Sequence, residues 1–157
     1  MKIINIIVLV ILMVPTALFA EGSKIIADVK TSAEGIAEAL KSSGYEADFT
    51  IKSLKELDRF FDEHTEGGKA KPGGLLEKRT AIKIFSISSY VGVVLRKNYG
   101  GEWIWMGSDS DVEMRLELRL KDGVGLWPTQ KVMKRFRNGD KDSLYLYGIA
   151  AGKIQKE

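Results

Sequence analysis

The chain has 157 residues, no cysteine, a single histidine and a formal net charge of +3 at pH 7. The lack of cysteine excludes disulfides, thiol catalysis, a thiolate metal site and lipid attachment at a signal-peptide cysteine. One histidine excludes a histidine-rich zinc site, and the nearly balanced charge gives no support to a nucleic-acid partner.

Residues 1–20 have the layout of a secretory signal peptide. Lys2 precedes an apolar run, Pro15 follows it, and the stretch LFA at 18–20 offers a cleavage site. The apolar run is about a dozen residues, shorter than the roughly 20 that span a membrane, so cleavage is favoured over an uncleaved anchor. We therefore expect an exported protein, periplasmic or secreted, whose residues 21–157 form a single domain without a later transmembrane span.

The first part of the mature chain gives helical signals of unequal strength. Residues 24–30 resemble a short strand or an ordered tail, and residues 33–43 a short helix. SLKE at 53–56 has the pattern of a capping box, and the apolar residues that follow at helical spacing predict a helix over 54–64. EGGKAKPGG at 66–74 predicts a flexible connector within the domain.

Residues 75–99 are the most apolar part of the mature chain. Apolar side chains occur most of the way round the predicted helix, which is typical of a buried helix. Gly100 can adopt the left-handed conformation that ends it. The hydrophobic period then changes to two, and Trp103 and Trp105 share one side of a predicted strand.

The second half of the chain predicts a small sheet and further helices. VEMRLELRL at 112–120 alternates apolar and charged residues, which predicts a half-buried strand with one solvated face. A third strand is expected over 124–127, a short helix between Thr129 and Asn138, and a helix over 144–154. The predicted fold class is α+β, with N-terminal helices, a three-stranded antiparallel meander and one or two short C-terminal helices.

The sequence predicts no catalytic residue, no metal ligand and no cofactor. GSDSDVE at 107–113 is acidic, but Met114 and Leu120 stand where a calcium loop requires glycine and a bidentate glutamate. His64 accompanies no nucleophile motif. Glu102 and other acidic residues near the same hairpin could form a hydrolase pair only if they meet in space, which spacing does not decide.

Four residues are candidates for binding. Lys131, Lys134 and Arg135 fall on one helical face, which is either a solvated face or a patch for an acidic protein or an anionic envelope component. Trp105, with Trp103, either belongs to the core or lines an apolar groove.

Much of the mature chain, from Ala47 to Leu144, resembles a bacterial family known only as a domain of unknown function. The family shows a helix with a Y-x-G-E-V core, a G-G-x-W junction and a closing P-x-x-K-V-x-K-R-x-x-N-G-x-x-D-S-L stretch. The matching residues are Tyr90, Gly92, Gly100, Gly101, Trp103, Pro128, Lys131, Val132, Lys134, Arg135, Asn138, Gly139, Asp142, Ser143 and Leu144. This chain departs from the pattern at Val93, where the family has glutamate. The resemblance implies an α+β fold and a bacterial origin, and it implies no activity.

Together these observations favour an exported, non-catalytic protein that binds another protein or an envelope component. An inhibitor or immunity-like role is one version of this hypothesis. The alternatives are a carboxylate-dependent hydrolase acting on envelope glycan, and a carrier of a small apolar ligand in a groove lined by Trp103, Trp105 or Trp127. The sequence leaves the identity of the partner and the oligomeric state open.

Overall fold

The computed structural model of the chain describes residues 16–106 and 116–154, with side chains from residue 22 onward. In chain order, the elements are α1 (Thr16–Ser42), α2 (Leu54–His64), β1 (Thr65–Glu66), β2 (Lys69–Ala70), α3 (Thr80–Tyr99), β3 (Glu102–Trp105), β4 (Leu116–Arg119), β5 (Gly125–Leu126), α4 (Pro128–Asn138), the 3-10 turn η2 (Gly139–Asp142) and α5 (Leu144–Ile154).

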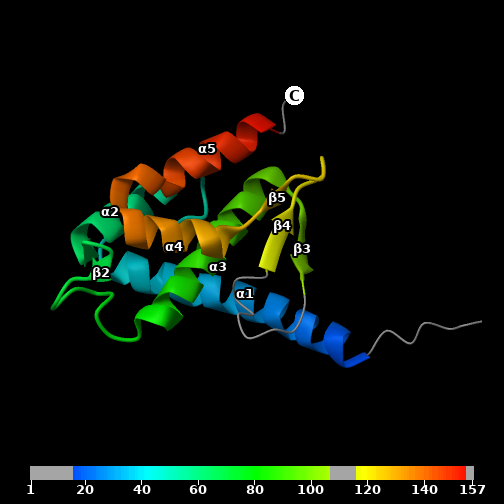
Figure 1. Ribbon diagram of the computed structural model, residues 1–157, viewed down its shortest axis with the longest axis horizontal. Helices are drawn as coiled ribbons and strands as arrows, with labels where there is room; N and C mark the ends of the chain where they lie inside the picture. Colours follow the sequence, from blue (N-terminus) through cyan, green and yellow to red (C-terminus); the bar gives the residue numbers. More distant parts are fainter. Residues whose placement is uncertain (1–15, 107–115, 155–157) are drawn as a thin grey trace, which may run out of the picture.

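The fold is α+β, as the sequence predicts. Helices come first, then the antiparallel sheet β3-β4-β5, then the C-terminal helices. In Figure 1, α1 runs along one side of the molecule and α5 along the opposite side, with α4 between them and α3 crossing α1 obliquely. The three-stranded sheet lies beside α3. No helix in 16–106 or 116–154 combines the length and the apolar character that a membrane crossing needs.

Helix α3 is the centre of the core. Ile87, Tyr90, Val91, Val94 and Leu95 have essentially no exposed surface, which confirms the prediction of a helix buried on several sides. The helix begins at Thr80, somewhat later than the predicted boundary. It packs mainly against α1 and α4, so the other elements are placed around it.

The prediction for the start of the mature chain is wrong. Residues 24–30 are neither strand nor tail but part of α1, which runs without interruption into the helix expected from residue 33. Val29, Ala33, Ala37 and Leu40 are buried at helical spacing and carry the contact with the core. Two of these four residues are alanines, so the hydrophobic periodicity was weak although the helical face is continuous.

The capping box predicted at 53–56 does not form. Ser53 already has helical dihedral angles (φ −63°, ψ −16°) and makes no side-chain cap bond. Its hydroxyl donates to the carbonyl of Thr50 at 2.7 Å, so the Tyr90 hydroxyl is the donor in the 2.7 Å bond between Ser53 and Tyr90. Ser53 therefore ties the start of α2 to the centre of α3.

Two other segments differ from their predictions. The expected connector at 66–74 contains part of a two-stranded hairpin, in which Glu66 pairs with Lys69. The strand predicted over 112–120 is observed as β4, while residues 107–115 lie outside the described residues.

Glu117 was expected on the solvated face of β4, but it is 4% exposed. Its carboxylate occupies the space that Gly125 on β5 leaves without a side chain, and Arg119 pairs with it at 2.8 Å.

Candidate functional site

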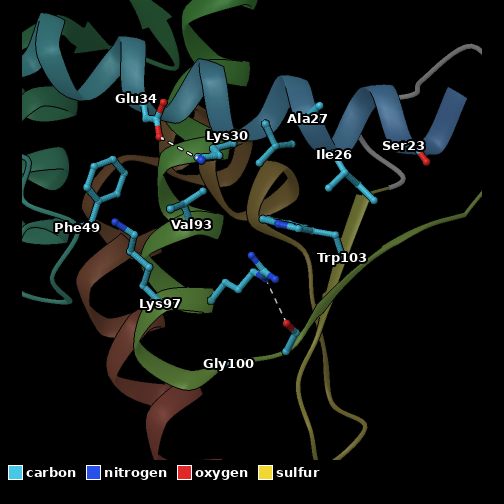
Figure 2. Close-up of a pocket in the computed structure, with 13 residues that line it drawn as sticks. Ser23, Ile26, Ala27, Lys30, Glu34, Phe49, Val93, Lys97, Gly100 and Trp103 are labelled. Carbon is cyan, nitrogen blue, oxygen red and sulfur yellow. Dashed lines mark hydrogen bonds and ion pairs between the residues drawn. The ribbon is translucent and has the colours of Figure 1, made fainter. Parts of the chain in front are cut away.

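An open groove of about 800 Å³ lies between α1, the second half of α3 and the start of β3. Figure 2 shows Ile26 and Ala27 on the α1 side, Val93 on α3 and Trp103 on β3. The apolar lining consists of Ile26, Ala27, Val29, Phe49, Val93 and Trp103. Its volume is within the roughly 300–1,000 Å³ typical of sites for small ligands, which are mostly apolar.

Glycines in α3 and in the α3–β3 junction position Trp103 at the groove. A Cβ atom on Gly92 would lie 2.1 Å from the indole Cη2 atom, so the ring rests directly on the helix backbone. Gly100 and Gly101 have φ angles of 77° and 99°, which glycine adopts without the strain of a side chain. The chain can therefore leave α3 and turn back so that Trp103 covers the helix it has just left.

Phe49 closes the other end of the groove in a strained backbone conformation. Its φ angle is 61°, a left-handed value that costs a bulky residue roughly 1–2 kcal/mol. The Tyr90 hydroxyl accepts its N–H at 3.0 Å, Asn98 Nδ2 donates to its carbonyl at 3.1 Å, and its ring stacks on Tyr90 at 4.7 Å. These contacts hold Phe49 in its strained conformation at the end of the groove.

The charged residues of the lining are mostly basic. Lys30, Arg96 and Lys97 line the groove with one carboxylate, Glu34. Lys97 Nζ lies 4.2 Å from the centre of the Phe49 ring, and Lys30 Nζ lies 4.0 Å from Glu34 Oε1. The groove therefore combines an apolar floor with an excess of positive charge.

The predicted basic face on α4 is not a continuous exposed surface. Arg135 is 1% exposed; its Nε donates to Asp58 Oδ1 at 2.9 Å and its Nη2 to Asp62 Oδ1 at 2.5 Å. Lys131 is mostly buried and pairs with Asp142 at 2.8 Å. Only Lys134 is exposed. The spacing placed the residues on one face correctly, but α2 covers that face at Arg135.

The structure separates the tryptophans. Trp103 lines the groove, whereas Trp105 packs against Gly22 of α1, where an added Cβ would lie 3.1 Å from the indole. Trp105 is half-buried, and its Nε1 atom has no hydrogen-bond partner in the described part of the chain. Trp127 donates its backbone N–H to the Tyr147 hydroxyl at 3.2 Å and does not line the groove. Trp105 is therefore a packing residue here, and Trp103 is the tryptophan available to a ligand.

His64 belongs to a separate cluster, in which both ring nitrogens are occupied. Its Nδ1 accepts the N–H of Leu75 at 3.2 Å, so the ring is neutral with the proton on Nε2, 3.0 Å from the Tyr45 hydroxyl. The Tyr45 hydroxyl donates to the carboxylate of Glu63. Burial lowers the pKa of His64, and burial with the Glu63 bond raises the pKa of Tyr45 to about 12. This cluster holds α2 to its neighbours and offers no free base.

Sequence reasoning missed most of the groove. Arg96, Lys97 and Phe49 were not among the predicted binding residues. The acidic turn at 107–113, for which no metal site was predicted, lies outside the described residues.

Comparisons of the chain with protein-family models, curated proteins and solved structures find no match. The resemblance to a domain of unknown function therefore stays a prediction.

Proposed function

We propose that the chain is an exported, non-catalytic binding protein that carries a small ligand with an apolar body in the groove between α1, α3 and β3. The observation that carries the proposal is the groove itself, whose apolar lining includes the half-buried indole of Trp103. A large apolar concavity left open to water is unfavourable in a small protein unless something binds there. Export enters the proposal from the signal-peptide layout of residues 1–20.

The chemistry of the lining supports binding over hydrolysis. A glycoside hydrolase needs two carboxyl groups on opposite sides of the scissile bond. Among the described residues, Glu34 is the one carboxylate in the lining of the groove. His64 is engaged at both nitrogens elsewhere in the fold, so it does not serve as a base for this groove.

A pair of exposed alanines on α1 provides a test. Ala27 lines the groove, and Ala39 lies on the same helix outside it. Ala27→Phe places a ring in the groove and should abolish binding of dodecanol, followed by tryptophan fluorescence and by calorimetry on the full-length chain. Ala39→Phe adds the same ring elsewhere and should leave binding unchanged. Equal binding by both variants, or no binding of dodecanol and other apolar probes by the parent chain, contradicts the proposal.

A further inference from the structure

Two lysine side chains, those of Lys30 and Lys97, lie at one end of the groove, beside Phe49, and the indole of Trp103 lies at the other end (Figure 2). An entirely apolar ligand would gain nothing from such cations, and it would remove part of their hydration when it bound. The lining therefore suits a ligand that is itself amphipathic.

The cations of the groove are weakly compensated by the protein. Arg96 Nε donates to the carbonyl of Gly101 at 3.2 Å, and within the described residues no carboxylate forms an ion pair with Arg96 or with Lys97. The ion pair of Lys30 with Glu34 is 4.0 Å long and joins two exposed side chains, so it contributes little. Guanidinium and ammonium groups in this state can still donate to an anion.

Phe49 holds Lys97 at this end of the groove. The ammonium lies over the face of the ring, and the ring is itself stacked on the buried Tyr90. An aromatic face attracts a cation but does not neutralise it. Lys97 is therefore oriented by Phe49 while its charge remains available to a ligand.

We infer that the ligand is a single-chain amphiphile with an anionic head, a carboxylate or a phosphate. The apolar chain lies on Ile26, Val93 and Trp103, and the head lies against Arg96 and Lys97, with Lys30 nearby. This inference rests on the proposed carrier function and names the class of its ligand.

The test compares probes of equal chain length on the full-length protein. Dodecanoate and dodecyl phosphate are titrated by calorimetry below their micelle concentrations, and dodecanol is titrated below its solubility limit. At least one anion should bind about tenfold or more tightly than dodecanol, because hydrogen bonds to a charged group are stronger than those to a neutral hydroxyl. This advantage should shrink as salt is added. The tighter anion identifies the head group.

Charge-removing variants locate the head. Arg96→Gln combined with Lys97→Gln should remove the preference for the anion and change the affinity for dodecanol less than about twofold. The matched control is Lys55→Gln: Lys55 also lies over an aromatic ring, that of Tyr145 at 4.4 Å, but it does not line the groove. Retained dodecanol binding shows that the double variant is folded.

The outcomes separate the two proposals. Equal binding of dodecanol and both anions overturns the anionic head and leaves the carrier function standing. An anion preference that survives in the double variant also overturns the assignment to Arg96 and Lys97. If none of the three probes binds, the carrier function fails, and the inference about its ligand fails with it.

Discussion

Replacing Asp58 by asparagine should destabilise the protein by several kcal/mol, far more than the loss of an exposed charge. The Asp58 carboxylate joins three helices, since it lies on α2 and binds α4 and the start of α5. Oδ1 accepts from Arg135 Nε and from the N–H of Leu144, both at 2.9 Å, and Oδ2 accepts from Ser143 Oγ at 2.7 Å and the N–H of Tyr145 at 3.1 Å. The substitution keeps the shape of the side chain and replaces one acceptor oxygen by a donor.

The magnitude follows from the burial of Arg135. This side chain is 1% exposed, and its Nη1 atom already has no hydrogen-bond partner in the described part of the chain. Without the Asp58 charge, the guanidinium keeps its bond to the backbone carbonyl of Asp58 and a single carboxylate partner, Asp62, whose side chain is 60% exposed. Removing one partner of a buried ion pair costs about 3–5 kcal/mol. For a domain of this size, the midpoint of thermal unfolding should fall by roughly 10 °C.

The assay is urea unfolding followed by circular dichroism on the parent chain and on Asp58→Asn, with Asp62→Asn as control. Both carboxylates bind the same guanidinium, but Asp62 is exposed and should cost no more than about 1 kcal/mol. Equal free energies of unfolding for the two variants would refute the reasoning, because Asp58 would then not be the residue that joins the helices.

Two further predictions concern the rest of the fold. Burial lowers the folded-state pKa of His64, the only histidine in the chain. The stability that neutral His64 confers is therefore present above pH 6.5 and is lost as the pH falls below that value. When unfolding is measured between pH 7 and pH 5, this loss should be absent in His64→Gln. Gly92→Ala should lower the free energy of unfolding by about 1–3 kcal/mol and shift the tryptophan emission, because the added Cβ would lie 2.1 Å from Trp103. Gly35→Ala is the control, because Gly35 lies in α1 with open space around it. This substitution should raise the free energy of unfolding by roughly 0.5–1 kcal/mol in the same assay.

The elements best predicted from the sequence are those whose signals are local and large. Helix α3 combines an apolar surface with Gly100 at its end, and β3 follows with alternating tryptophans; both were identified with small errors of boundary. The C-terminus of α4 at Asn138 was predicted equally well, because a glycine such as Gly139 after the last helical residue is a strong local signal for the end of a helix. In each case the residues that determine the element lie within it.

The errors occur where a distant segment decides the outcome. Ser53 has the residue type and spacing of a cap, yet Thr50 and Tyr90 use its hydroxyl. Arg135 has the spacing of a solvated face, yet the two aspartates of α2 cover it. Tertiary packing determines which of several possible partners a polar side chain binds, and the hydrophobic periodicity of the sequence carries no information about that choice.

The groove was beyond sequence prediction for the same reason. Its walls come from α1, from the single residue Phe49 and from the α3–β3 junction, which are far apart along the chain. Of the three tryptophans that the sequence offered as possible lining residues, only Trp103 lines it. Nothing local distinguishes it from Trp105, which has the same period and lies two residues later but packs on Gly22 instead.

The junction that makes the groove also holds the fold, and this determines how its function can be tested. Trp103 rests on Gly92 and pairs through its backbone with Leu118, so its removal would disturb the sheet as well as the groove. Loss of binding in a Trp103 variant would therefore not separate a ligand contact from a packing defect. Ala27, Arg96 and Lys97 line the groove with exposed side chains, so changes there test binding with the core intact.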